Sequence, residues 1–263
     1  MTRWLRFERD GTAAFGTLDG EAIAVHQGSM FESPTPTGER VALNSVRLLA
    51  PAQPSKMIAL WNNFRALGAK LGLSEPEEPL FFIKAASSYA DPGATIYKPA
   101  DYAGKVVFEG ELAIVIGATC RNASLDEAGA AIFGYTCVND ITAADILQKD
   151  PSFAQWTRAK SFDGFSPFGP VIATGLRAQD LVVRTVLNGT ERQNYPISDM
   201  VFPAPTLVSL LSRSMTLAPG DVICCGTSLG VGVMREPSNT VEVIIDGIGS
   251  LRNHYVTSAA SGG

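Results

Sequence analysis

The segment from Phe108 to Ile116, Phe-Glu-Gly-Glu-Leu-Ala-Ile-Val-Ile, constrains the fold of this chain more than any other. Every residue from Leu112 onward is apolar, so the strand that these residues predict must be covered on both faces and lie inside a sheet. Side chains alternate along a strand, so Glu109 and Glu111 point to the same face at its start. We therefore expect two carboxylates at the mouth of a buried strand.

Other apolar runs predict an α+β protein dominated by strands, without the regular strand–helix alternation of a nucleotide-binding fold. Further strands are expected at residues 56–60, 80–83, 181–187, 221–225 and 241–245. Helices are expected at residues 65–73, 124–132 and 206–212. The second of these has Ser124 as its N-cap and Glu127 at the capping-box position.

The first fifty residues predict a small β appendage. Asp-Gly pairs at residues 10–11 and 19–20 separate alternating segments and indicate hairpins. Residues 28–45 are rich in Ser, Thr, Pro and Gly, which favours a linker. We expect a small β domain over residues 1–50 and a catalytic domain over residues 51–263.

Composition excludes several classes of function. The formal net charge is -5 and no basic run occurs, so nucleic acid is not an expected partner. Charged residues near the N-terminus interrupt any signal peptide, and no apolar run approaches the roughly 20 residues that cross a membrane. The four cysteines lack zinc-site spacing and are expected to be buried thiols. A cytoplasmic protein without membrane partners is predicted.

A third carboxylate, Asp140, follows the apolar strand predicted before it. Together, Glu109, Glu111 and Asp140 form an all-oxygen set that favours Mg²⁺, Mn²⁺ or Ca²⁺ over zinc. A small 2-oxo acid could chelate such an ion through its carboxylate and keto oxygens. Two alternatives stay open, namely a solvated pair of glutamates and a helix cap at Asp140 or Thr142.

Two other segments carry candidate binding residues. Residues 155–170 contain Arg158 and Lys160 among aromatic residues, glycines and prolines, which favours an ordered loop lining a pocket. An ordinary surface lysine is the alternative for Lys160. Thr227 lies in a glycine-rich turn after an apolar strand, where backbone N–H groups can face an anion. That turn could equally have no role in binding.

In this order, these segments resemble the fumarylacetoacetate hydrolase family from about Pro54 to Tyr255. The matching stretches are Lys84 after Phe-Phe-Ile, residues 109–117, Gly134-Tyr135, Val-Asn-Asp140, Gln155-Trp-Thr-Arg158, Lys160-Ser-Phe-Asp163, Ser198-Asp-Met200, Pro219-Gly-Asp-Val222, Gly226-Thr227 and residues 247–251.

The resemblance implies a mixed β-roll catalytic domain, usually a homodimer. It implies a Mg²⁺ or Mn²⁺ held by Glu109, Glu111 and Asp140, with Lys160 alongside. Lys160 and Glu109 are the expected catalytic residues. The expected substrate-binding residues are Thr227, Lys84 and Arg158. Members of the family include C–C bond hydrolases, decarboxylases and isomerases or tautomerases of oxo acids.

Two departures from the family pattern bear on mechanism. Hydrolytic members typically carry Asn-Tyr-x-x-His-x-x-Glu on a lid helix, whereas here Leu67 and Lys70 stand at the His and Glu positions. Many members also have an arginine where this chain has Ala144. Arg65 is a candidate replacement for that arginine. The carboxylates of residues 75, 77 and 78 are candidate replacements for the missing base.

The resemblance favours a C–C bond hydrolase of a small 2,4-dioxo acid, such as an acylpyruvate or a fumarylacetoacetate-like acid, acting through a metal-bound enolate. The alternative is a 2-oxo acid decarboxylase or an isomerase or tautomerase of aromatic catabolism. The missing His–Glu pair favours the alternative, because enolisation needs no activated water. A non-catalytic relative that retains the metal site ranks third.

Overall fold

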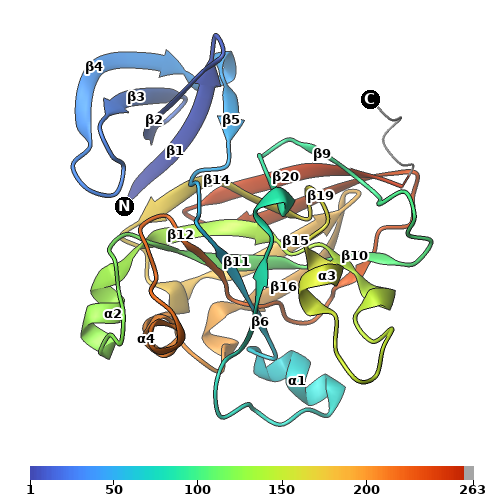
Figure 1. Cartoon of the computed structure of the whole chain (residues 1–263). Helices are drawn as coiled ribbons and strands as arrows, with labels where there is room; N and C mark the ends of the chain where they lie inside the picture. Colours follow the sequence, from blue (N-terminus) through green and yellow to red (C-terminus); the bar gives the residue numbers. More distant parts are fainter. Residues whose placement is uncertain (258–263) are drawn as a thin grey trace.

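The computed structural model describes residues 1–257, and one large sheet organises them (Figure 1). Its strands follow the order β4-β3-β2-β1-β14-β12-β11-β17-β6-β7, with β5 paired to β1 and β8 to β14. The bounds are β1 Thr2–Arg9, β2 Thr12–Asp19, β3 Ala22–Gln27, β4 Thr35–Ala42, β5 Arg47–Leu49, β6 Met57–Trp61, β7 Leu80–Lys84, β8 Tyr89–Ala90, β11 Gly110–Ile116, β12 Ile132–Asn139, β14 Ser166–Thr174 and β17 Val222–Cys224.

The described residues also form two smaller sheets. One has the order β16-β15-β19-β20-β9 and the other β13-β10-β18. Parallel pairs join β6 to β17, β8 to β14 and β9 to β20, and the other pairs are antiparallel. The predicted α+β class and mixed β-roll are therefore confirmed. The bounds are β9 Thr95–Tyr97, β10 Val106–Phe108, β13 Thr142–Ala143, β15 Val182–Leu187, β16 Thr190–Pro196, β18 Gly232–Val233, β19 Ser238–Ile245 and β20 Gly249–Val256.

Residues 1–257 form four α-helices outside the sheets, and the three predicted helices are among them. Ser124 and Glu127 form the predicted capping box at the start of α2. None of the helices in residues 1–257 is long and apolar enough to cross a membrane. The bounds are α1 Arg65–Leu71, α2 Leu125–Ala131, α3 Trp156–Lys160 and α4 Ala204–Ser214, with 3₁₀ turns η1 Leu43–Ser45, η2 Ala86–Ser88, η3 Ala144–Ile146, η4 Ala178–Asp180 and η5 Ile197–Asp199.

The strand β11 lies in the interior of the large sheet, as its sequence predicts. It pairs with β12 on one side and β17 on the other, and all seven of its residues are buried. The prediction of one continuous strand through Glu109 is wrong, because β10 ends at Phe108 and β11 begins at Gly110. The four cysteines are buried and free, as expected.

The linker predicted over residues 28–45 is wrong for its second half, because β4 pairs with β3 at the edge of the large sheet. Only Val41 of its eight residues is buried. An edge strand held by backbone hydrogen bonds and exposed on both faces shows no apolar alternation, so the sequence pattern could not reveal it.

The ordered loop predicted over residues 155–170 is wrong except at residues 161–165, because α3 and the start of β14 occupy most of that range. Proline argues against an interior strand. Here the register between β12 and β14 shifts between Tyr135 and Cys137, whose partners are Ala173 and Gly169, so Pro170 falls in a bulge. The missing N–H group of proline is tolerated at such a bulge.

The N-terminal strands β1 to β5 stand together at one end of the molecule, above the main body in Figure 1. The first of them is hydrogen-bonded into that body, because Thr2, Arg3 and Trp4 of β1 pair with β14. A domain boundary between residues 50 and 51 remains a prediction.

Candidate metal centre

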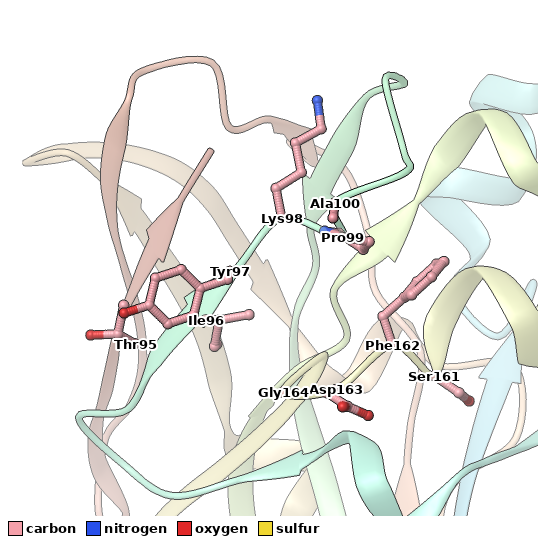
Figure 2. Close-up of a pocket in the computed structure, with 10 residues that line it drawn as sticks. All are labelled: Thr95, Ile96, Tyr97, Lys98, Pro99, Ala100, Ser161, Phe162, Asp163 and Gly164. Carbon is pink, nitrogen blue, oxygen red and sulfur yellow. The ribbon is translucent and has the colours of Figure 1, made fainter. Parts of the chain in front are cut away.

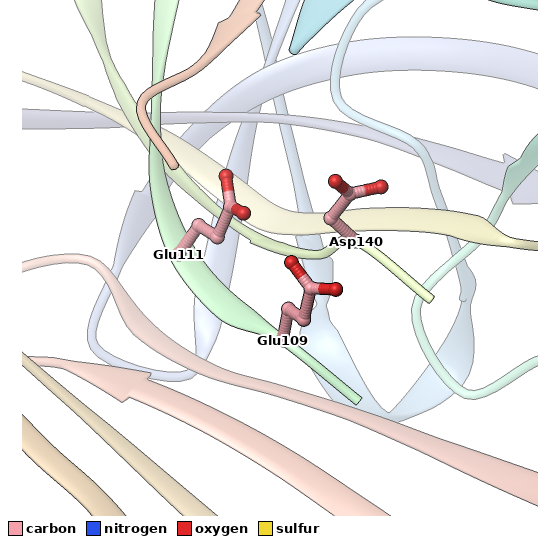
Figure 3. Close-up of side chains that lie close together, drawn as sticks. All are labelled: Glu109, Glu111 and Asp140. Atoms are coloured by element: carbon pink, nitrogen blue, oxygen red, sulfur yellow. The ribbon is translucent and has the colours of Figure 1, made fainter. Parts of the chain in front are cut away.

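The carboxylates of Glu109, Glu111 and Asp140 converge on one space at the start of β11 (Figure 3). One oxygen of each lies within 4.8 Å of the others. The register of β11 and β12 explains the convergence, because Gly110 faces Asn139 and Asp140 follows directly. The Asp140 N–H donates to the Glu109 carbonyl at 2.8 Å, which fixes the junction.

Burial distinguishes this cluster from ordinary surface acids. Glu111 and Asp140 are each 1% exposed, and Glu109 retains 15% of its side-chain surface. The alternative of a solvated glutamate pair is therefore wrong. A helix cap at Asp140 is also wrong, because both of its carboxylate oxygens accept hydrogen bonds from lysines.

Two buried lysines neutralise part of the cluster. Lys160, at the end of α3, donates to Asp140 Oδ2 at 2.7 Å and to Glu109 Oε1 at 2.9 Å. Lys84, at the end of β7, donates to Asp140 Oδ1 and to the Phe165 carbonyl. The alternative of a surface lysine at position 160 is therefore wrong. The ammonium group of Lys84 faces Asp140. The role of Lys84 in substrate binding stays a prediction.

The electrostatics of the cluster follow from burial and charge. Burial raises the pKa of Glu111 well above its ordinary value, and the charges of Asp140 and Glu109 raise it further. Burial alone would raise the pKa of Asp140, but the ammonium groups of Lys160 and Lys84 outweigh it and lower that pKa. Burial opposes the charge on Lys160, yet the three carboxylates outweigh it and raise its pKa.

These residues fit a divalent cation. Three carboxylates face only two ammonium groups within residues 1–257, so the buried cluster carries an excess of negative charge. A hard cation would relieve it and accept oxygen ligands from all three side chains. The ligand set has neither sulfur nor imidazole, which disfavours zinc.

The turn after β17 lies directly against the cluster. The Gly226 N–H donates to Glu111 Oε2 at 2.9 Å. Thr227 donates to the Gly110 carbonyl at 3.2 Å and accepts a hydrogen bond from Gln193 Nε2 at 2.8 Å. The turn thus holds Glu111 and the start of β11 in place through these hydrogen bonds. The role of Thr227 in substrate binding stays a prediction.

The guanidinium group of Arg65 is bound to other residues of the protein. This arginine begins α1, donates to the Met200 carbonyl at 2.5 Å, and pairs with Glu75 at 3.0 Å. Arg65 therefore anchors α1, and Glu75 is occupied as its partner. On the same helix Leu67 is half-buried and Lys70 is exposed.

Arg158 is exposed on α3 and lines a surface pocket with Tyr102, Asp145 and Lys149. An adjoining pocket lies where β9 meets the segment after Lys160 (Figure 2). Neither pocket is lined by a residue of the carboxylate cluster. The second pocket is lined by Thr95, Ile96, Tyr97, Lys98, Pro99, Ala100, Ser161, Phe162, Asp163 and Gly164.

Two buried polar residues at the cluster were missed by sequence reasoning. Thr142 donates to Glu109 Oε1 at 2.7 Å, and Gln193 Oε1 accepts the Gly110 N–H at 2.9 Å. Thr142 follows Asp140 by two residues, where the sequence predicts a possible helix cap and no contact with Glu109. Gln193 stands in an otherwise polar strand, β16, so no local pattern marked it.

Comparison with protein families agrees with this geometry. Residues 56–256 match the model described as fumarylacetoacetate (FAA) hydrolase C-terminal, and residues 2–51 match the model described as Rv2993c-like, N-terminal. The chain belongs to the fumarylacetoacetate hydrolase family. The predicted family and fold are thereby confirmed.

Relatives within the fumarylacetoacetate hydrolase family cover most of the chain. Protein Rv2993c of Mycobacterium tuberculosis is 41% identical over 260 residues, which span 94% of this chain and 95% of that protein. Oxaloacetate tautomerase YisK of Bacillus subtilis is 36% identical over 225 residues, 81% and 74% of the two chains. The crystal structure of 2-hydroxyhepta-2,4-diene-1,7-dioate isomerase from Mycobacterium marinum has a TM-score of 0.89 at 36% identity, covering 98% and 99%.

Proposed function

We propose that this protein is a divalent-metal-dependent tautomerase or isomerase that interconverts the keto and enol forms of a 2-oxo acid. The observation that carries the proposal is the buried Lys160 ammonium, which bridges Glu109 and Asp140 at 2.9 and 2.7 Å within the three-carboxylate cluster. Similarity to an oxaloacetate tautomerase and to a dienedioate isomerase supports it.

The metal site would be formed by Glu109, Glu111 and Asp140, and Mg²⁺ or Mn²⁺ suits their oxygen ligands. When bound, this ion supplies Lewis-acid stabilisation of negative charge on the keto oxygen. The Gly226 N–H and the lysines hold the carboxylates in position.

Lys160 is assigned to the oxyanion. Its raised pKa keeps the amine protonated, so it donates a hydrogen bond and does not act as a base. Its Nζ already lies beside the carboxylates that would bind the ion. A substrate keto oxygen next to the cluster would therefore lie within reach of this donor.

Glu109 is assigned to proton transfer at carbon 3 of the substrate. It is the most exposed of the three carboxylates, at 15%, against 1% for Asp140 and Glu111. Both of its side-chain contacts are made through Oε1, from Thr142 and Lys160. Its Oε2 has no hydrogen-bond partner in residues 1–257, so Glu109 would bind the ion through Oε1 and accept the proton on Oε2.

C–C bond hydrolysis is less well supported. It needs a general base for water, and Leu67 and Lys70 occupy the positions of the His–Glu pair found in hydrolytic members. The two histidines lie elsewhere, with His26 packed against Trp4 and His254 beside Thr240. Glu75, a candidate replacement base, is paired with Arg65.

The proposal is tested by proton NMR in D₂O on the EDTA-treated protein, before and after addition of Mg²⁺. Loss of the carbon-3 proton signal of oxaloacetate or phenylpyruvate, faster than without enzyme and only with Mg²⁺, is the expected result. Pyruvate and acetate from acetylpyruvate would instead establish hydrolysis. Carbon dioxide release from oxaloacetate without faster exchange would establish decarboxylation. Binding of oxalate without turnover of any substrate would identify the protein as a non-catalytic relative.

Homodimer formation and a cytoplasmic location are part of the same proposal, and resemblance to the family supports the first. Light scattering after size-exclusion chromatography measures the oligomeric state directly. A monomer at micromolar concentration would contradict the dimer.

A further inference from the structure

We propose that three aromatic residues, Trp61, Phe82 and Trp156, bind the substituent that the 2-oxo acid carries beyond its keto group. We call these residues the aromatic wall. The preferred substrates then carry an apolar, planar group at that position and not a second carboxylate. This inference rests on the proposed function and specifies the class of substrate.

The aromatic wall is a continuous surface of rings. The ring centroids of Trp61 and Trp156 lie 4.8 Å apart, and those of Phe82 and Trp156 lie 5.6 Å apart with the planes stacked at 21°. Phe82 is buried, whereas both tryptophans are half-buried. Each tryptophan therefore keeps ring surface that a planar apolar group could cover.

Two elements connect the aromatic wall to the carboxylate cluster. On α3, Trp156 and Lys160 are four residues apart and lie on one face, so the ring and the ammonium group are neighbours. Lys160 Nζ lies 5.8 Å from the centroid of the Phe82 ring. The same ammonium group thus contacts the metal ligands and one ring of the wall.

The strand β7 makes the second connection. Lys84, Phe82 and Leu80 alternate onto one face, and Leu80 pairs with Trp61 across the strands. Exposure rises along this face from 1% at Lys84, which contacts Asp140, to 9% at Phe82 and 45% at Leu80. This face of β7 therefore runs from the buried cluster at Lys84 towards solvent at Leu80, and it is apolar from Phe82 onward.

Neither lysine that contacts the carboxylate cluster is available to a second substrate carboxylate. Within residues 1–257, the cations that contact the cluster are Lys84 and Lys160. Lys84 is paired with Asp140, and Lys160, which is paired with Asp140 and Glu109, is assigned to the keto oxygen. The Arg65 guanidinium is held by the Met200 carbonyl and Glu75. Placing an unpaired carboxylate against three aromatic rings carries a desolvation penalty.

The test compares Mg²⁺-dependent deuterium exchange into phenylpyruvate and oxaloacetate, each divided by its rate without enzyme. We expect kcat/KM for phenylpyruvate to exceed that for oxaloacetate at least tenfold. In Trp61→Ala and Trp61→Leu this ratio should fall about tenfold through a higher KM for phenylpyruvate. Trp4→Leu, in β1, is the matched control and should keep the wild-type ratio. An unchanged ratio in both Trp61 variants overturns the inference.

Failure of the proposed function would be visible separately, as no exchange in either substrate. The aromatic wall is then tested by calorimetry with Mg²⁺ and benzoylformate, a 2-oxo acid that carries a phenyl group and cannot enolise. Oxalate, which lacks the substituent, is the reference ligand. The expected result is a benzoylformate affinity, relative to oxalate, about tenfold lower in Trp61→Ala than in wild type. Equal relative affinities overturn the inference.

Discussion

The ammonium group of Lys160 lies 2.7 Å from Asp140 Oδ2, and both side chains are almost completely buried. A buried ion pair of this kind is stable only where hydrogen bonds and further charges compensate for lost hydration. Here Glu109 and Lys84 provide them. The pair therefore fixes the position of the Lys160 ammonium group beside the carboxylate cluster. Stabilisation of an oxyanion requires a positively charged donor held in place in this way.

Replacement of this lysine should separate catalysis from metal binding. Lys160→Met is expected to lower kcat for enolisation about 10²–10³-fold, because a preorganised donor to the oxyanion is lost. Its affinity for Mg²⁺ should not decrease, because the change removes a positive charge next to the ligands. Exchange kinetics and calorimetry with Mg²⁺ measure the two effects. Lys149→Met, at an exposed lysine, is the control. Loss of Mg²⁺ binding in Lys160→Met would contradict the assigned role.

Lys84 should affect stability more than chemistry. It is 1% exposed and its ammonium group is shared between Asp140 and the Phe165 carbonyl. Lys84→Met leaves a buried carboxylate without one of its partners, and such changes cost about 3–5 kcal/mol in the free energy of unfolding. Urea denaturation of the metal-free protein measures this. Lys105→Met, at an exposed lysine, should have little effect, and an equal loss in both variants would argue against the buried pair.

The metal-free protein should lose stability as pH rises because of Glu111. Burial and the charges of Asp140 and Glu109 raise the pKa of Glu111 well above 4.5, its ordinary value. A carboxyl group with a higher pKa in the folded state contributes stability that is complete below its unfolded pKa and is lost as pH rises through its folded pKa. Glu111→Gln carries no such charge, so in EDTA it should gain stability relative to wild type above about pH 4.5.

Thermal denaturation of both proteins across pH 4–8 measures this difference. Glu78→Gln, at an exposed glutamate, is the control and should follow wild type. Mg²⁺ must displace the Glu111 proton, so its affinity for wild type should rise over the same range. Parallel stability curves for wild type and Glu111→Gln would show that Glu111 is not the group responsible.

Most of the candidate metal centre could be predicted from the sequence, because Glu111 lies on β11, and Glu109 and Asp140 directly adjoin β11 and β12, two adjacent strands with strong apolar patterns. The pairing of Gly110 with Asn139 in the β11–β12 register is enough to bring Asp140 next to Glu109. Gln193 comes from β16 in another sheet, and only its tertiary contact with Gly110 reveals it. The wrong predictions have a similar origin. The strand β4 is stabilised by pairing, not by an apolar face, and β14 tolerates Pro170 at a bulge.

Thr142 should be needed for activity through its contact with Glu109 alone among the three carboxylates. Its hydroxyl donates to Glu109 Oε1 at 2.7 Å, which leaves Oε2 to accept the substrate proton. A hydrogen bond to a charged group is worth about 1.5–3 kcal/mol, so Thr142→Val is expected to lower kcat about 10–100-fold. Thr142→Ser, which keeps the hydroxyl, should recover most of the loss. Equal activities of the two variants would exclude a hydrogen-bonding role.

Arg65 should prove to be an anchor of α1 and not a substrate ligand. Its guanidinium donates to the Met200 carbonyl at 2.5 Å and pairs with Glu75, while Asp199 accepts the Ala66 N–H at 3.0 Å. The side chain is 44% exposed, so these contacts are worth about 1 kcal/mol in the free energy of unfolding. Arg65→Ala should therefore lower the Tm by about 2–4 °C.

Its KM for a 2-oxo acid should stay within about twofold of wild type, because a guanidinium already bound to the 199–201 segment has no donor directed at substrate. Glu75→Ala removes the same ion pair from the other side and is the matched variant. Initial rates over a range of substrate concentrations, with saturating Mg²⁺, give the two constants. A tenfold rise of KM in Arg65→Ala but not in Glu75→Ala would restore Arg65 as the residue that binds the substrate carboxylate.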